Sequence, residues 1–191
     1  MLLPATPSTR RWPKVRQFVL GRTIEEATKN ARKLEKQGYS YSYDMLGEAA
    51  RTDADALRYH QAYSVAIGKL TPACIHSDIR MNPGISVKLS ALHARYEFGQ
   101  KERVMTELVE RTKTLALQAK EANMGFNIDA EEQDRLDLSL DIIEAVLSDD
   151  ALAGWDGFGI VVQAFGPRAS FVLDWLYALA TRLDRKIMVR L

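Results

Sequence analysis

Two kinds of segment alternate along the chain: longer ones whose apolar residues have helical spacing, and short apolar runs. Apolar residues three or four positions apart predict helices over residues 23–37, 52–69, 101–122, about 136–146 and 170–183. The short runs between them predict strands over residues 39–46, 85–89, 125–129, 157–164 and 187–191. Strands that alternate with helices predict a parallel sheet covered by helices, either a barrel or a doubly wound sheet.

Capping residues support the bounds of the first predicted helix. Thr23 is followed three positions later by Glu26, which is the pattern of a capping box at a helix start. Gly38 suits the left-handed turn that often ends a helix. We therefore expect the first helix to open at Thr23 and to end near Gln37.

Every predicted strand carries one polar residue near its carboxyl end. These residues are Asp44, Lys88, Asp129, Gln163 and Arg190. A (β/α)8 barrel gathers such positions at one mouth, and the chain lacks the Gly-x-Gly-x-x-Gly turn of a dinucleotide-binding fold. We predict an α/β fold of the TIM type, an incomplete (β/α)8 barrel with about five of the eight strands and an N-terminal helix. The chain ends within or just after a strand, so we expect it to be truncated.

Residues 124–132 combine an apolar strand with a carboxylate at its end. Asp129 lies between Ile128 and Ala130, so its carboxylate is expected at the edge of a buried strand, where it needs a partner or serves only as a cap. The acids that follow are expected in the first turn of the next helix, where the helix dipole favours negative charge. They are Glu131, Glu132 and Asp134.

Composition and charge exclude several classes of protein. The chain has 191 residues, 47% hydrophobic and 27% charged, which is ordinary for a globular protein and argues against disorder. Lys and Arg number 26 against 25 Asp and Glu, so the net charge of +1 gives no general attraction to nucleic acid or to anionic membranes. Cys74 stands alone and cannot form an internal disulfide. No apolar run approaches the roughly 20 residues of a membrane-spanning helix.

The amino-terminal segment is the one part of the chain with a skewed charge. Before Glu25 it contains five basic residues and no acid, namely Arg10, Arg11, Lys14, Arg16 and Arg22. We interpret residues 1–20 as a basic linker or the ragged start of a domain. A nucleic-acid arm or a targeting peptide is the alternative.

The polar residues at the strand ends allow two kinds of chemistry. Lys88 on a barrel strand is placed to form a Schiff base with a carbonyl substrate, with Asp129 or Glu131 as a proton shuttle, as in an aldolase-type lyase. Alternatively, Lys88 and Arg190 are fixed positive charges, one for a substrate carboxylate and one for an electron-rich cofactor ring. Lys88 in a buried ion pair with Asp129 is a third, purely structural interpretation. The residues alone do not separate these hypotheses.

Several motifs resemble a known family. They are Tyr-Ser-Tyr-Asp-Met-Leu-Gly-Glu-Ala-Ala (41–50), Gly-Ile-Ser-Val-Lys-Leu-Ser-Ala-Leu-His (84–93), Asn-Ile-Asp-Ala-Glu-Glu (127–132), Val-Val-Gln-Ala-Phe (161–165) and Met-Val-Arg-Leu (188–191). In this order they resemble the proline dehydrogenase domain of the bacterial bifunctional proline utilization A family, from about Gly21 to Leu191. We therefore interpret residues 21–191 as the N-terminal part of such a domain.

The resemblance implies an enzyme that uses FAD. A distorted (β/α)8 barrel would hold FAD and take a hydride from C5 of L-proline to flavin N5, giving 1-pyrroline-5-carboxylate, the first step of proline catabolism to glutamate. Electrons would pass on to a quinone. The parent protein would be cytoplasmic, with possible peripheral association at the inner face of the membrane, and a homo-oligomer.

The resemblance also implies roles for individual residues. Asp129 would be the active-site aspartate beside the isoalloxazine, and Arg190 would face flavin N5 as a catalytic and cofactor-binding residue. Lys88 would bind the proline carboxylate and Glu48 would be a gate over the substrate. Further flavin contacts would come from Ala130, Val161 and Gln163. No metal site and no nucleic-acid partner are predicted.

The family has a flavin-binding sequence after the Arg-Leu pair and a late helix with two arginines for the substrate, which this sequence does not contain. We therefore expect the 191-residue chain to be inactive alone. The missing strands would leave the edges of the first and fifth strands unpaired. A Schiff-base lyase that uses Lys88 and a non-catalytic binding module remain the alternatives.

Overall fold

A computed structural model of the chain describes residues 19–45 and 47–191. The chain divides into two compact units, Met1–Tyr41 and Ser42–Leu191. The predicted basic linker at residues 1–20 lies almost wholly outside the described residues. It therefore stays a prediction, as does the nucleic-acid arm.

The described part of the first unit is built on helix α2 (Ile24–Glu35). The Thr23 hydroxyl accepts a hydrogen bond from the Glu26 backbone N–H at 3.2 Å, as expected of an N-cap. The Glu26 carboxylate, however, accepts from the backbone N–H of Arg22 at 2.9 Å instead of that of Thr23. The helix start is thus confirmed, while only half of the predicted capping box forms.

The second unit contains one parallel sheet in the described residues. Its strands are β1 (Ser42–Asp44), β2 (Gly84–Val87), β3 (Gly125–Ile128), β4 (Phe158–Val161) and β5 (Met188–Arg190). Each strand pairs with the next in sequence, so the spatial order is β1-β2-β3-β4-β5. A doubly wound sheet would reverse this order at a switch point. The unbroken order confirms the predicted barrel-like arrangement of an incomplete (β/α)8 fold.

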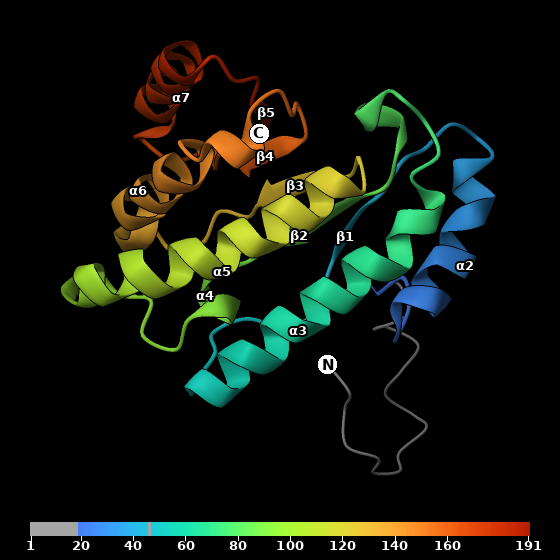
Figure 1. Cartoon of the computed structure of the whole chain (residues 1–191), viewed down its shortest axis with the longest axis horizontal. Coiled ribbons are helices and arrows are strands. Elements are labelled where there is room, and N and C mark those ends of the chain that lie inside the picture. Colours follow the sequence, from blue (N-terminus) through green and yellow to red (C-terminus); the bar gives the residue numbers. More distant parts are fainter. Residues whose placement is uncertain (1–18, 46) are drawn as a thin grey trace. The chain divides into compact units, whose positions relative to one another are not determined.

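Helices connect consecutive strands. They are α3 (Asp53–Leu70), α4 (Leu89–Leu92), α5 (Lys101–Glu121), α6 (Leu136–Leu147) and α7 (Ala169–Leu183). Short 3-10 turns lie between them: η1 (Thr71–Ala73), η2 (Ile79–Met81), η3 (Phe98–Gln100), η4 (Gln133–Arg135) and η5 (Asp150–Leu152). Because such crossovers are right-handed and the strand order never reverses, the long helices cover the same face of the sheet. Figure 1 shows α3, α5 and α6 side by side along that face.

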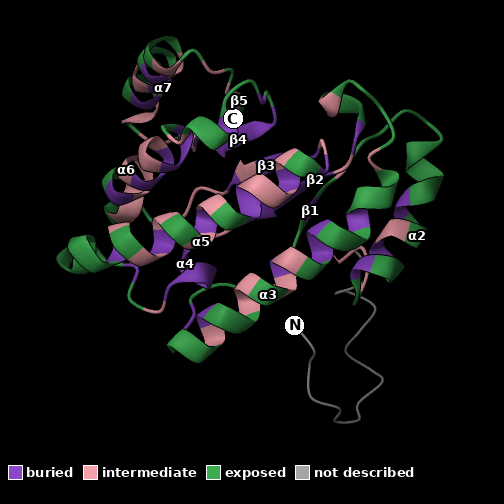
Figure 2. Cartoon of the chain, viewed as in Figure 1, coloured by how far each residue is buried: buried purple, intermediate pink, exposed green. Residues whose placement is uncertain are grey.

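The helix-covered face of the sheet is apolar. The register aligns Tyr43, Ile85, Phe126 and Phe158 in one row across β1 to β4. A second row aligns Val87, Ile128, Ile160 and Val189 across β2 to β5. All of these side chains except Val189 are buried, and Figure 2 shows the buried residues gathered in the strands and along stripes of the helices. The core therefore lies between the sheet and its helices.

The opposite face of the sheet carries small and polar residues. Gly84 pairs with Gly125, and Asn127 pairs with Gly159. A Cβ atom on Gly159 would collide with the side-chain oxygen of Asn127, so glycine makes room for this amide. The face is therefore shaped to hold polar side chains.

The core predicts the effect of one deletion in the sheet. Phe126 is fully buried and its ring centroid lies 5.8 Å from that of Phe158, so Phe126→Ala should lower the free energy of unfolding by about 3–5 kcal/mol. Phe171 on α7 is 71% exposed, and Phe171→Ala should change it by less than about 0.5 kcal/mol. Urea unfolding monitored by circular dichroism measures both. Equal losses for the two variants would contradict the assignment of the core.

Candidate functional site

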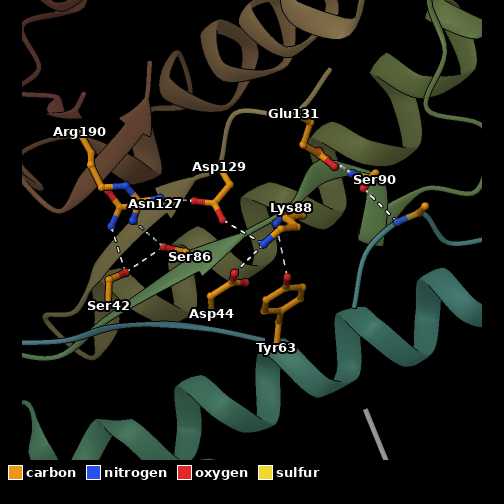
Figure 3. Close-up of polar contacts among 11 residues, drawn as sticks. Ser42, Asp44, Tyr63, Ser86, Lys88, Ser90, Asn127, Asp129, Glu131 and Arg190 are labelled. Atoms are coloured by element: carbon orange, nitrogen blue, oxygen red, sulfur yellow. Dashed lines mark hydrogen bonds and ion pairs between the residues drawn. The ribbon is translucent and has the colours of Figure 1, made fainter. Parts of the chain in front are cut away.

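Charged side chains gather at the carboxyl edge of the sheet. Asp44 and Arg190 are the last residues of β1 and β5, while Lys88 and Asp129 follow β2 and β3 directly. Because the strands are parallel, these ends lie at the same edge. Figure 3 shows Lys88 between the two aspartates and Arg190 on the far side of Asp129.

The four side chains form a continuous chain of ion pairs. Lys88 Nζ donates to Asp44 Oδ2 at 2.6 Å and to Asp129 Oδ2 at 3.1 Å. Arg190 Nη2 donates to the other oxygen of the same carboxylate, Asp129 Oδ1, at 2.6 Å. We refer to Asp44, Lys88, Asp129 and Arg190 as the ion-pair chain. It alternates in sign and its formal charges cancel.

The members of the ion-pair chain differ in exposure. The side chains of Asp129 and Lys88 are 12% and 19% exposed, while those of Asp44 and Arg190 are 44% and 51% exposed. Burial opposes the charge on Lys88, but the hydrogen bonds and charges of Asp44 and Asp129 outweigh it and raise the pKa of Lys88 above its usual range. Lys88 is therefore a permanent cation at neutral pH.

Backbone contacts hold the two inner members in place. The Lys88 N–H donates to the Tyr63 hydroxyl of α3 at 3.4 Å, and the Asp129 N–H donates to the Val87 carbonyl at 3.0 Å. Burial raises the pKa of Tyr63, so its hydroxyl stays neutral. Tyr63 was missed at the sequence level, because nothing near it in the sequence distinguishes it from a core aromatic.

A second polar row lies next to the ion-pair chain on the same face. The hydroxyls of Ser42 and Ser86 lie 2.9 Å apart. Asn127 Nδ2 donates to Ser42 at 3.5 Å, and Arg190 Nη1 donates to Ser86 at 3.5 Å. The sequence prediction missed these three residues because it treated the strands as continuous apolar runs. The alternation in Gly-Ile-Ser-Val-Lys (84–88) and Gly-Phe-Asn-Ile-Asp (125–129) was the signal that would have found them.

Two of the three acids after Asp129 do not lie where they were expected, while Asp134 lies in the first turn of η4, directly before α6. Helix α6 begins at Leu136, and Glu131 and Glu132 precede even the η4 turn at Gln133. Glu131 instead accepts a hydrogen bond from the backbone N–H of Ser90 at 3.0 Å, across 41 positions of sequence. Burial raises the pKa of Glu131 despite the hydrogen bonds from Ser90. The prediction that Glu131 caps the following helix was wrong, because the chain stays extended after β3.

Four of the residues that the resemblance assigns to the flavin line a cavity that is too small to hold a flavin ring, and Arg190 is not among them. Asp129, Ala130, Val161 and Gln163 border a cavity of about 40 Å³ between the ends of β3 and β4 and helices α6 and α7. Gln163 lies past the end of β4. Its side-chain oxygen accepts from Gln133 Nε2 at 2.7 Å.

Glu48 is not joined to this group. Its side chain is exposed, and within residues 19–45 and 47–191 it forms no hydrogen bond or ion pair. The structure therefore brings together Lys88, Asp129 and Arg190, adds Asp44 to them as a direct partner, and leaves Glu48 apart.

None of the helices in the described residues is long and apolar enough to cross a membrane. No group of three or more His, Cys, Asp or Glu side chains among those residues is arranged to hold a metal ion.

The geometry suits binding of a zwitterion or of a charged ring. A lysine ammonium has three N–H donors, of which the two aspartates take two, so one is left for a ligand carboxylate. The half-exposed guanidinium of Arg190 also keeps donors beyond its bonds to Asp129 and Ser86. The site can therefore present two cations, Lys88 and Arg190, and one carboxylate, Asp129, to a bound zwitterion and to a ring beside it.

Comparisons with known proteins place the chain in a family. Its sequence matches the family description "Proline dehydrogenase" over residues 27–191. It is 54% identical to the bifunctional protein PutA of Klebsiella aerogenes, over 92% of this chain and 13% of that protein. For PutA of Rhizobium meliloti the identity is 55%, over 92% of this chain and 14% of that protein.

A solved structure agrees with the sequence comparison. A mutant of proline utilization A from Bradyrhizobium japonicum superposes with a TM-score of 0.80 at 52% identity, covering 89% of this chain and 17% of that one. The chain thus spans about 13% of the length of the PutA protein from Klebsiella aerogenes. Because the family match extends from residue 27 to residue 191, the chain belongs to the proline dehydrogenase family.

Proposed function

We propose that this chain carries the substrate-binding residues of an enzyme that oxidises L-proline to 1-pyrroline-5-carboxylate with FAD. The observation that supports this most is the ion-pair chain at the carboxyl edge of a parallel sheet, in a member of the proline dehydrogenase family. Active sites of barrel enzymes lie at that edge. Relatives at 52–55% identity are named proline utilization A or PutA, which fits the same substrate.

Lys88 is the residue proposed to bind the proline carboxylate. Its raised pKa keeps the ammonium charged, and its third N–H donor is free of the two aspartates. Lys88 is 19% exposed, so a carboxylate bound there is partly shielded from water, which strengthens the pair.

Asp129 is the residue proposed to stabilise the charge that develops on the substrate. Proline loses a hydride from C5 and a proton from its nitrogen, and positive charge builds on the C5=N unit as the hydride departs. A fixed carboxylate near that unit lowers the energy of this charge. Asp129 fits the task because its position is fixed by two cations.

The polar residues present fit a flavin. FAD supplies, when bound, the acceptor of the two electrons removed from proline. Arg190 has unused guanidinium donors beside the space next to Asp129, and a cation there stabilises negative charge on a reduced ring. Gln163 offers an amide, while Ala130 and Val161 contribute small apolar surface at the rim of the pocket. Ala130, Val161, Gln163 and Arg190 are the residues proposed to contact the cofactor.

The further partners are proposed from the family resemblance. Electrons would leave for a quinone, and the enzyme would be a cytoplasmic homo-oligomer with a peripheral contact at the inner face of the membrane. Glu48 is proposed as a gate residue, and its exposed position leaves it able to meet a partner outside the described residues.

The Schiff-base alternative is disfavoured by the charge on Lys88. A lysine that attacks a carbonyl must be deprotonated, and lyases achieve this by lowering its pKa. The two aspartates have the opposite effect on Lys88, whose pKa is raised from 10.5. Lys88 is thus suited to act as a fixed charge.

The first prediction tests the activity itself. Among the described residues β1 and β5 each pair on one side only, so the outer backbone N–H and C=O groups of both strands lack partners in the sheet. We expect the full-length gene product to contain flavin and to reduce a dye when proline is added, and the 191-residue chain alone to do neither. Absorbance at the flavin band and dye reduction measure both. A full-length product without proline-dependent reduction would refute the proposed function.

The second prediction tests the carboxylate site in the full-length product. Lys88→Met removes a charge-assisted hydrogen bond worth about 1.5–3 kcal/mol, so KM for proline should rise roughly tenfold or more. Lys186→Met is the matched control, because Lys186 is 81% exposed and pairs only with Asp156. Steady-state kinetics at several proline concentrations measure KM. The role of Lys88 is rejected if both variants keep the original KM.

The third prediction separates the oxidoreductase from the lyase. Because the pKa of Lys88 is raised, its amine stays protonated well above neutral pH. Treatment with a carbonyl compound and sodium cyanoborohydride at pH 7 should therefore modify the Lys88 peptide no more than the Lys186 peptide. Mass spectrometry of the digest gives the comparison. Selective trapping at Lys88 would favour the lyase.

A further inference from the structure

Three loops at the carboxyl edge of the sheet are tied together by two side chains. The loops follow β1, β2 and β3, and their described parts contain residues 45 and 47–52, the short helix α4 (Leu89–Leu92) and residues 129–132. Ser90 lies in α4 and Glu131 in the third loop. Neither residue belongs to the ion-pair chain, and neither is explained by the chemistry of proline oxidation. Figure 3 shows Ser90 between Glu131 and the first loop.

Ser90 bonds to the other two loops at the same time. Its hydroxyl accepts from the Ala49 N–H at 3.1 Å, and its carbonyl accepts from the Ala50 N–H at 2.9 Å. Its own N–H donates to Glu131 at 3.0 Å. With only 3% of Ser90 exposed, water cannot readily replace these bonds. We refer to Ser90 and Glu131 as the loop latch.

The backbone of the first loop supports this interpretation. Ala49 has a φ of 51°, in the left-handed region that non-glycine residues avoid. Such a conformation persists only where the surroundings enforce it. The two bonds from Ser90 act on the N–H of Ala49 and on the N–H of the next residue. The loop latch is therefore what holds the loop in this shape.

Capping of α4 alone does not account for the arrangement. Glu131 caps the start of that helix, but α4 has only four residues. Glu131 is also buried enough for its pKa to be raised, and burial opposes the charge that a capping acid carries. The bond between the Ser90 hydroxyl and Ala49 contributes nothing to a helix cap. The contacts point instead to the relative placement of the three loops.

Three of the four members of the ion-pair chain lie in or next to the latched loops. Lys88 lies two residues before Ser90, Asp129 lies two residues before Glu131, and Asp44 ends the strand before the first loop. We propose that Ser90 and Glu131 are positioning residues, which fix the separation of Asp44, Lys88 and Asp129 so that Lys88 meets the substrate carboxylate in a preset geometry. The expected effect on KM for proline rests on the proposed function. The expected effect on the loops rests only on their contacts.

The structural consequence is tested by hydrogen exchange on the full-length product. In Ser90→Ala the backbone amides of Ala49 and Ala50 should exchange about tenfold faster or more, because the hydroxyl acceptor is lost and the strained loop relaxes. Ser148→Ala is the control, since Ser148 is exposed and bonds only to the carbonyl of Glu144 in its own helix. Unchanged exchange in Ser90→Ala would overturn the loop latch, whether or not the protein oxidises proline.

The effect on KM for proline is tested with substitutions at two neighbouring acids, Glu131 and Glu132. Glu131→Gln keeps the size of the side chain but replaces an acceptor oxygen with a donor. KM for proline should rise about fivefold to tenfold while kcat falls less than about twofold. Glu132→Gln is the matched control, because Glu132 is 64% exposed and pairs with Arg135. A merely structural loss would lower the amount of active enzyme and leave KM unchanged, and this outcome would reject the positioning role.

The two measurements distinguish the failure of each idea. If the full-length product does not oxidise proline, the proposed function fails while the hydrogen-exchange result still decides the loop latch. If Ser90→Ala does not fold, Glu131→Gln carries both tests, because it replaces the charge-assisted hydrogen bond to the Ser90 N–H with a weaker neutral one and should speed exchange at Ala49.

Discussion

The carboxyl edge of the sheet depends on the carboxylate of Asp129. Lys88 binds one of its oxygens at 3.1 Å and Arg190 binds the other at 2.6 Å. Without an anion between them, two cations on the same polar face would repel each other, and water screens such repulsion poorly where the side chains are partly buried. Asp129 thus allows the fold to place two positive charges close together. Any ligand that binds there meets a site whose charges are already arranged.

The division of the sheet into two faces makes this arrangement possible. One face is filled by rows such as Ile85, Phe126 and Phe158, so the helices cover it and exclude water. On the other face Gly84, Gly125 and Gly159 leave space, and Asn127 occupies part of that space. Since side chains alternate along a strand, each apolar residue in the core requires a neighbour on the polar face. The core and the site are built from the same strands.

The elements of the fold were predictable from the sequence because each is determined locally. Helical spacing marked the long helices to within a few residues, and the motifs carried the resemblance to the family. Short elements were less accurate. The first strand, Ser42–Asp44, is shorter than the predicted residues 39–46, of which residue 46 lies outside the described residues.

The site was predictable only where a polar residue stood out in an apolar run. That signal found Asp44, Lys88, Asp129 and Arg190, and it named the pair between Lys88 and Asp129 as one interpretation. It did not show that the ion pair of Lys88 with Asp44, at 2.6 Å, is shorter than the pair with Asp129, at 3.1 Å. Glu131 and Ser90 are 41 positions apart, and their bond exists only because β2 and β3 are neighbours in the sheet. Contacts of this kind follow from topology and carry no local pattern.

The charge balance of the ion-pair chain bears on which ligand it accepts. Two aspartates and two cations cancel, so a net anion or cation would leave an uncompensated charge beside the two least exposed members, Lys88 and Asp129. An amino-acid zwitterion adds one charge of each sign. Its carboxylate can approach Lys88 from the side of Asp44, whose pair with Lys88 is the more exposed and hence the easier to loosen. A neutral chain of ion pairs therefore suits the proposed substrate, which is itself neutral but carries two charges.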